Sequence, residues 1–413
     1  MFCRKTMRNN PKTVVGQPGA AGVFCCGMIT GQQQTATVPA ADASRTVQRY
    51  QGEVVYIYAY NVAHEMTREP LTKVFGQPVA QFGVDADKRS PKRFLFYKPQ
   101  MVRLPQIERV GPRGKVRIER TIKLLPIGAI SITVRVPFDV SSLRDLVAYH
   151  DLQFEHGSLH QEVMRLAEEV VAELKSHYIR PHPQLLEEEA YTVFCIAAPL
   201  VSATGSVVPA ESWFHAHRRE IAALLTQEPD VTRLSKQEAD ESTARYLSYY
   251  DNDLVVIDWD AALIVDEPRD FDETLYIMEL ANLQLAELEA YDRLLDGTLE
   301  RSYRDLGEHP LRSRADVLRE LREIRIDLAR FNDELSNITK FFGDWHLARI
   351  YEKIASRFHL GDWHRTIEGK LRTLDDLYQM LRHEQTNHLM VILEATIVLL
   401  FVIDLVVLLL RLK

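Results

Sequence analysis

The sequence predicts an α+β protein, with one or two N-terminal mixed α/β units, an all-helical antiparallel hairpin or coiled-coil region, and one C-terminal transmembrane helix. Three observations lead to this prediction. Alternating Val, Ile and Thr indicate strands between residues 50 and 267. Apolar residues then recur at alternating steps of four and three, which is typical of helices that pack against helices. Residues 389–410 are almost entirely apolar.

Changes in composition divide the chain into five predicted segments. Residues 1–49 are polar and rich in small and breaker residues, so we expect a disordered tail. Residues 50–183 and 190–267 are expected to be two α+β units with a boundary near Pro181 to Pro183. Residues 271–388 are expected to form a helical hairpin and stalk, and residues 389–410 the membrane span.

In the first unit, "EVVYIYAY" (53–60) predicts a strand, and "HEMTREPLTKVFG" (64–76) predicts a short helix that ends at Gly76. A loop rich in Lys, Arg and Pro follows from Asp85 to Pro112. The segments 115–125 and 128–138 predict two paired strands. Residues 141–179 read as one helix with Ser141 or Ser142 as its N-cap.

In the second unit, "YTVFCIAA" (191–198) predicts a strand and residues 209–227 an amphipathic helix with proline in its first turn. Residues 242–268 predict two or three further strands, with turns at 251–253 and near Asp260. No strand is expected after Pro268.

The helical region carries a heptad seam, which we expect to pack against a helix from Phe271 to about Arg301. The seam comprises Val317, Leu321, Ile324, Leu328, Phe331, Leu335, Ile338 and Phe342. Downstream, "GDWH" occurs twice. Gly343 and Gly361 would each end a helix, and Asp344 and Asp362 would be the N-caps of the next helices.

A helix of some fifty residues is predicted from Trp363 onward, because the four–three spacing continues without a stop signal. The spacing residues are Ile367, Leu371, Leu374, Tyr378, Leu381, Gln385, His388, Ile392, Ala395, Leu399, Val402, Val406 and Leu409. This pattern predicts a homo-oligomer that the double change Leu374→Lys with Leu381→Lys would dissociate.

Residues 389–410 would span about 33 Å as a helix, which is the thickness of a bilayer core. With only three residues after the span and no convincing signal peptide, we expect the body to stay in the cytoplasm. Glu394 and Asp404 would then be intramembrane carboxylates, at a cost of roughly 2.5–3.5 kcal/mol for a centrally placed acid unless compensated.

The C-terminal residues resemble the Required-for-Meiotic-nuclear-Division family. The match comprises Phe341, Phe342, Trp345, Leu347, Ile350, Tyr351, Lys370, Leu371, Asp376, Leu377, Arg382, Leu393, Glu394 and Asp404. The chain departs from the family at Trp363 and Glu368. The resemblance implies a non-catalytic, oligomeric protein anchored at its C-terminus in a bacterial or mitochondrial inner membrane, with its body in the cytoplasm or matrix and translation machinery as a candidate partner.

The chemistry-bearing residues give little indication of an enzyme. The net charge of −8 provides no general attraction to nucleic acid or anionic lipid, so any such binding would be local. Four cysteines are too few and too badly spaced for a disulfide framework. His346, His359 and His364 lack the spacing of a helical zinc site, and no phosphate loop or nucleophile elbow is present.

We therefore expect a non-catalytic, membrane-anchored, oligomeric scaffold without cofactor or metal. It would hold an unidentified partner at the lipid bilayer and would have no specific nucleic-acid binding. The alternative is an ion or metal transport assembly that uses the carboxylates of Glu394 and Asp404.

Overall fold

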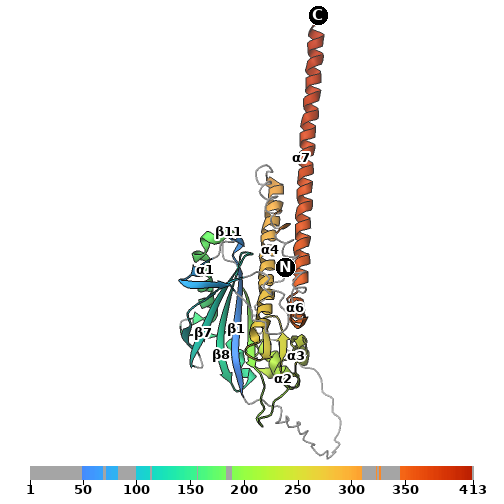
Figure 1. Cartoon of the computed structure of the whole chain (residues 1–413). Coiled ribbons are helices and arrows are strands. Elements are labelled where there is room, and N and C mark those ends of the chain that lie inside the picture. Colours follow the sequence, from blue (N-terminus) through green and yellow to red (C-terminus); the bar gives the residue numbers. More distant parts are fainter. Residues whose placement is uncertain are drawn as a thin grey trace, which may run out of the picture. The chain divides into compact units, whose positions relative to one another are not determined.

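An eleven-stranded, mainly antiparallel sheet is the central element of the protein, which is described here by a computed structural model (Figure 1). The structure describes residues 49–67, 71–81, 99–111, 114–155, 157–182, 188–308, 322, 325–326 and 345–411. All of them belong to one unit, Ala41–Lys413. The strand order is β13-β14-β15-β12-β1-β8-β7-β5-β4-β3, and β6 pairs with β7 outside this path.

The strands and helices have the following bounds. The sheet strands are β1 (Tyr50–Asn61), β3 (Lys73–Val74), β4 (Gln77–Gln81), β5 (Gln100–Arg103), β6 (Ile107–Gly111), β7 (Gly114–Leu125), β8 (Ala129–Val140), β12 (Glu189–Ala197), β13 (Tyr246–Leu247), β14 (Leu254–Ile257) and β15 (Ala261–Asp266). Two small ribbons pair β2 (Ala63–Met66) with β11 (Tyr178–Pro181) and β9 (Gln153–Phe154) with β10 (Gly157–Ser158). The α-helices are α1 (Leu159–Glu173), α2 (Ala210–Leu225), α3 (Lys236–Ser242), α4 (Phe271–Glu308), α6 (Trp345–Arg357) and α7 (Leu360–Arg411), with short 3-10 helices η1 (Leu143–Tyr149), η2 (Lys175–His177) and η3 (Val231–Arg233).

Both faces of the sheet are covered, and strand β1 shows this directly. Successive side chains of a strand point to opposite faces. Tyr56 and Tyr58 belong to the core that contains residues of α1 and α2. Val55 and Ile57 belong to the core that contains residues of α4, α6 and α7. The central strand is therefore buried on both sides, which explains why "EVVYIYAY" is apolar almost throughout.

Most of the predicted strands are confirmed. Strand β7 pairs antiparallel with β8 from Glu119↔Arg135 to Leu125↔Ala129. Strand β12, helix α2 and strands β13 to β15 also lie where the sequence predicts them. No strand follows Pro268 among the described residues.

Two helix predictions are wrong. Residues 64–76 contribute to β2 and form the β3–β4 turn, where Phe75 and Gly76 both have positive φ. Residues 141–179 hold η1, the β9–β10 ribbon and α1 instead of one helix. Gly157, at φ 131°, interrupts the pattern. The true N-cap is Ser158, which forms a capping box with Gln161.

The predicted N-terminal units share one sheet. Strand β1 pairs antiparallel with β12, and β12 pairs in parallel with β15. Strands from both sides of the predicted boundary at Pro181 to Pro183 therefore belong to one sheet. Long-range pairing of this kind carries no local sequence signal, so the sequence suggested separate units.

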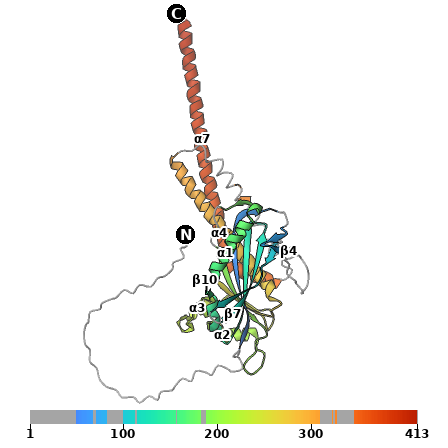
Figure 2. The same ribbon diagram turned by 90° about the vertical axis from the view of Figure 1, so that its left-hand side faces the viewer.

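The long C-terminal helix is confirmed as α7, which has 52 residues. It runs beside α4 at its start and continues beyond it (Figure 2). The α6–α7 joint differs from the prediction, because α7 begins at Leu360 and includes Gly361 and Asp362 in its first turn. His359 takes the left-handed conformation at φ 51° and separates the two helices.

The predicted membrane anchor is wrong. No helix within the described part of the chain combines the length and the apolar character needed to cross a membrane. Residues 389–410 lie in α7, where Glu394 and Asp404 interrupt the apolar sequence. The predicted single-pass localisation, with the C-terminus in a membrane and the body in the cytoplasm, is therefore wrong, and so is the intramembrane position of these two carboxylates.

Several predicted features lie outside the described residues. They are the tail at residues 1–48, all eight residues of the heptad seam from Val317 to Phe342, Phe341, the predicted helix end Gly343 and the N-cap Asp344. Arg382 lies in α7, but its side chain is outside the description.

Candidate functional site

Helices α4, α6 and α7 form a layer on one face of the sheet, which we call the helical platform. Its apolar core joins β1, β12, β14 and β15 to Leu288 of α4, Ile350 of α6 and Ile367 of α7, all of them fully buried. Polar side chains cross this interface at three places. Each place ties one helix to a defined partner, and together they are the candidate site.

The first place is a buried carboxylate between α4 and the sheet. Glu279 of α4 accepts a hydrogen bond from Lys123 Nζ of β7 and another, 2.6 Å long, from Ser131 Oγ of β8. Thr133 Oγ1 lies 3.4 Å from the same oxygen. All four residues are at most 9% exposed. Because the carboxylate has a cation and hydroxyl donors, its burial is compensated.

The cluster fixes the position of α4 along the sheet. Lys123, Ser131 and Thr133 lie on neighbouring strands and point to the same face. A shift of α4 by one turn, about 5.4 Å, would separate the charges and leave both buried without partners. Apolar contacts alone would tolerate such a shift more easily.

The second place lies where α6 ends. Arg357 is 7% exposed and donates to the carboxylate of Asp258, which is 3% exposed and follows β14. Burial raises the pKa of Asp258, while the Arg357 guanidinium and its hydrogen bond oppose that shift. The guanidinium also lies over the Trp259 ring, 5.2 Å from its centroid.

The α6–α7 joint continues this contact. The His359 ring stacks on Trp259 with centroids 5.3 Å apart, and its Nδ1 lies 2.9 Å from Asp362 Oδ2. The hydrogen bonds from His359 and Arg365 hold the pKa of Asp362 below its usual range. A non-glycine residue at positive φ is strained, and these contacts offset the strain. The direction in which α7 leaves the body is therefore defined.

The third place ties α4 to α6 and α7. Tyr351 of α6 donates a 2.6 Å hydrogen bond to Gln284 Oε1 of α4. Lys370 Nζ of α7 lies 2.6 Å from carboxylate oxygens of both Asp292 and Asp296 of α4. Burial lowers the pKa of Lys370, but its hydrogen bonds to the two aspartates outweigh that effect and raise it overall.

The residues predicted from the family resemblance fall into two groups. Leu347, Tyr351 and Leu371 are buried in the helical platform, and Lys370 makes the ion pairs just described. Trp345 and Leu393 are exposed, at 69% and 63%. The structure therefore brings the proximal group together and separates it from the distal one.

Glu394 and Asp404 are exposed on α7 and lie far along the helix from the three polar contacts. The histidines that the sequence analysis considered as zinc ligands make local contacts. The ring of His346 packs near Tyr249, and His364 Nε2 lies 3.3 Å from Glu368 Oε1. Within the described residues, no group of three or more His, Cys, Asp or Glu side chains is placed to hold a metal ion.

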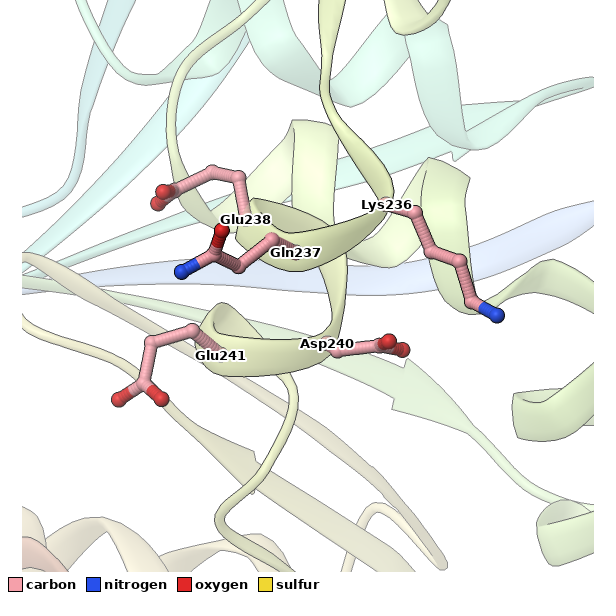
Figure 3. A pocket seen from close by; sticks show the side chains of 5 residues that line it. All are labelled: Lys236, Gln237, Glu238, Asp240 and Glu241. Carbon is pink, nitrogen blue, oxygen red and sulfur yellow. The ribbon is translucent and has the colours of Figure 1, made fainter.

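Helix α3 lines a shallow surface depression of about 620 Å³ (Figure 3). Its lining residues are Lys236, Gln237, Glu238, Asp240 and Glu241. Figure 3 shows that their side chains point in different directions from one short helix and do not converge on a common point. This arrangement is unlike a binding cleft, whose polar groups converge.

Sequence reasoning missed Glu279, Gln284, Asp258 and Arg357. A signal existed for the first two, because they are polar residues between the apolar residues Ile277, Met278, Leu280, Leu283 and Leu285 of one helix, where burial on several sides is expected. Arg357 and Asp258 carry no such signal, since a charge at the end of a helix or strand is ordinary in a sequence.

Comparison with known proteins gives a family for the sheet. Residues 51–272 match a family model described as the N-terminal domain of uncharacterized protein MJ0711. Uncharacterized protein MJ0711 of Methanocaldococcus jannaschii is 24% identical over 249 residues, which are 59% of this chain and 73% of that protein. No solved structure matches. The family match ends where α4 begins, so most of the helical platform lies beyond it.

Proposed function

We propose that this chain, which belongs to the family of the MJ0711 N-terminal domain, is a non-catalytic scaffold whose copies associate through the distal half of α7. The α+β body would hold a partner, and α7 would set the number and orientation of the copies. The observation that carries the proposal is the contrast along α7 between a covered proximal seam and an uncovered distal one.

The proximal seam is covered within the chain. Ile367, Leu371 and Leu374 are at most 5% exposed and pack in the helical platform. Lys370, between them, pairs with α4. The predicted dissociating change at Leu374 is therefore unsuitable as a test, because it would disrupt the core of a single chain.

The distal seam continues the same spacing without cover. Ile392, Leu399 and Val402 are 61%, 60% and 52% exposed. A helix of 52 residues is about 78 Å long, and α4 accompanies only its beginning. A second copy of α7 would cover the distal positions as α4 covers the proximal ones.

The heptad register puts the two acidic residues of the distal segment, Glu394 and Asp404, outside the proposed seam. With Ile392 and Leu399 at position a, Glu394 falls at position c and Asp404 at position f, which face away from a seam. Val398 at g and Ile403 at e, 62% and 50% exposed, would flank the seam. Because apolar residues at e and g widen the seam beyond a and d, we expect more than two copies. Leu400 at b and Phe401 at c, 61% and 75% exposed, lie outside the seam.

Cysteine cross-linking tests the proposed seam. The chain has four cysteines, Cys3, Cys25, Cys26 and the buried Cys195, so the cross-linking variants are made in a full-length background in which Cys3, Cys25 and Cys26 are replaced by serine. Full-length Leu399→Cys and Val402→Cys are expected to form covalent dimers under mild oxidation. The matched controls Glu394→Cys and Asp404→Cys, at the outward positions, are expected to cross-link at least several-fold less.

Equal cross-linking at all four positions would contradict a defined seam, and none at any position would contradict self-association. Flotation of the uncross-linked protein with phospholipid vesicles, abolished by Leu399→Lys, would also contradict the proposal, because lipid would then cover the distal segment.

The resemblance to the Required-for-Meiotic-nuclear-Division family is part of this proposal. Leu347, Tyr351, Lys370 and Leu371 support it, because the first two hold α6 and the last two hold the proximal end of α7 in the helical platform. These residues of the family motif therefore lie where α6 and the proximal end of α7 attach to the sheet.

A further inference from the structure

Exposed aromatic side chains gather where the β13–β14 turn meets the start of α6. Tyr249 and Tyr250 of the turn are 49% and 55% exposed, and their ring centroids are 4.7 Å apart. The ring of His346 in α6 lies 5.3 Å from the Tyr249 ring, and the preceding residue, Trp345, is 69% exposed. We call the side chains of Tyr249, Tyr250 and Trp345 the aromatic surface. Tyrosine and tryptophan are enriched among the residues that dominate binding energy in protein interfaces.

The turn that carries the two tyrosines is fixed by hydrogen bonds. The Asp253 carboxylate accepts one from the backbone amide of Tyr249 at 2.6 Å and another from that of Tyr250 at 3.1 Å. The amide of Ala210, at the start of α2, donates to the Asp251 carbonyl at 2.7 Å. The aromatic side chains are therefore presented on an ordered backbone, which lowers the entropy cost of binding a partner.

The loop that leads into α2 adds apolar side chains next to this turn. Val201 and Val207, 43% and 61% exposed, face each other in a β-bridge. Together with the aromatic surface they make up half of the exposed large apolar side chains that the structure describes before α7. Such grouping on three connected segments is typical of an interaction site rather than of scattered surface residues.

The part of the sheet that carries the turn is strongly acidic. Residues 210–270, which contain α2, α3 and β13 to β15, include 14 acidic and 6 basic residues. This excess equals the net charge of −8 of the whole chain, so the remaining residues are neutral on balance. All of residues 210–270 lie within the described part of the chain. A surface of this charge attracts a basic partner and repels an acidic one.

Two of these carboxylates lie beside the aromatic surface. Asp251 belongs to the turn, and Glu211 follows Ala210, which is bonded to the turn. Both are exposed, and within the described residues neither pairs with a lysine or arginine. The basic group nearest to Glu211 is His215 Nε2, at 3.9 Å. The arginines already engaged by groups of residues 210–270 are Arg218, Arg219, Arg245 and Arg269.

Helix α6 brings some positive charge to the same end. Arg349, one turn after Trp345, is exposed, and Lys353 is half-buried. Glu352 lies between them in the sequence and is also exposed, so these three residues leave a single positive charge. The carboxylates of the turn and of α2 outweigh it.

From these observations we propose that the aromatic surface binds a basic, arginine-rich segment of a partner protein. Guanidinium groups stack on tyrosine and tryptophan rings through cation–π contacts. The carboxylates of Glu211 and Asp251 would neutralise neighbouring cations and exclude acidic segments. The inference rests on the proposed scaffold function, because it names the class of partner that the body holds. It does not depend on the α7 seam, since α7 extends away from the end of the body that holds α2 and α3 (Figure 1).

Fluorescence anisotropy with full-length protein and a labelled peptide of six Arg-Gly repeats tests the aromatic surface. Tyr250→Ser with Trp345→Ser should bind the peptide at least about tenfold more weakly than wild type. The matched control, Val110→Ser with Met164→Ser, removes exposed apolar side chains from β6 and α1 and should bind within about twofold of wild type. All four side chains are at least 40% exposed, so far-ultraviolet circular dichroism should stay unchanged.

A second pair of variants tests the charge. Glu211→Gln with Asp251→Asn should weaken binding at least about threefold at roughly 50 mM salt, and the difference from wild type should shrink as salt screens the carboxylates. Glu155→Gln with Glu173→Gln removes the same charge from exposed positions beside and within α1 and should bind as wild type does.

Several outcomes would overturn the proposal. They are absence of binding by wild type, equal binding by the Tyr250 and Trp345 variant, equal weakening by either control, and equal binding of a Glu-Gly peptide. A lower molar mass of the Tyr250 and Trp345 variant in light scattering would also overturn it, because a second copy would then cover the surface. A wild-type protein that binds the peptide as a single chain would contradict the α7 seam alone, and an assembly that does not bind it would contradict this inference alone.

Discussion

Removal of the Lys123 ammonium would leave the Glu279 carboxylate buried without a cation. The two side chains are 11% and 7% exposed, so neither reaches enough water to compensate. Breaking a buried pair by removing one partner typically costs about 3–5 kcal/mol. We therefore expect Lys123→Met, which keeps the length of the side chain, to lower the free energy of unfolding by about that amount.

The double variant Lys123→Met with Glu279→Leu removes both charges. Only the Ser131 and Thr133 hydroxyls then lose an acceptor, at about 1 kcal/mol each. The double variant should therefore be more stable than Lys123→Met alone, with a coupling energy of at least about 1 kcal/mol between the two sites.

Urea unfolding monitored through tryptophan fluorescence measures these values, because Trp213 is fully buried and reports on the sheet core. Ser131→Ala is the matched control, since it deletes one hydroxyl donor without leaving a charge unpaired. A loss below about 1 kcal/mol for Lys123→Met, or a double variant less stable than the single one, would refute the assigned role of this cluster.

Three further predictions concern the other polar contacts. Arg357→Met should lower the free energy of unfolding by about 3–5 kcal/mol, because Asp258 would stay buried without its cation. The fluorescence of the partly exposed Trp259 should also change, and urea unfolding followed by fluorescence measures both effects. Lys370→Gln should leave the sheet intact but increase amide hydrogen exchange in α7 near Leu371, while Arg372→Gln, at an exposed position of the same helix, should not. Burial and the nearby His64 lower the pKa of His182 to about 4, so its neutral form is favoured by folding. The contribution of His182 is complete above about pH 6.5 and is lost as the pH falls toward 4, so stability should fall less between pH 7 and 4.5 in His182→Gln than in wild type.

The strands were predictable where local pattern determines them. Alternation in β7 and β8 predicted the pair correctly, because one residue in two faces each core. The segment 64–76 shows the limit. Its spacing of apolar residues suits a helix, but pairing of Met66 with Tyr178, 112 residues away, makes part of it a strand. Single-sequence patterns contain no information about such partners.

The helical platform was predictable in its elements but not in its contacts. Continuous four–three spacing correctly predicted α7. The same spacing could not show that α4 already covers Leu371 and Leu374, so it suggested the wrong position for a dissociating change. The joint was also misread, because Gly361 suggested the helix end while the stacking of His359 on Trp259 holds a non-glycine residue at positive φ.

The apolar segment at residues 389–410 shows why composition alone can mislead. Its sequence predicted a membrane span, and within the described chain no helix meets the requirement for one. The distal half of α7 exposes apolar side chains, and we propose that other copies of the chain cover them.

The molar mass of full-length protein measured by multi-angle light scattering tests this central claim most directly. The account predicts a mass of at least three chains of 47.5 kDa for wild type and of one chain for Ile392→Lys with Leu399→Lys. A single-chain mass for wild type, or an unchanged assembly in the double variant, would contradict it.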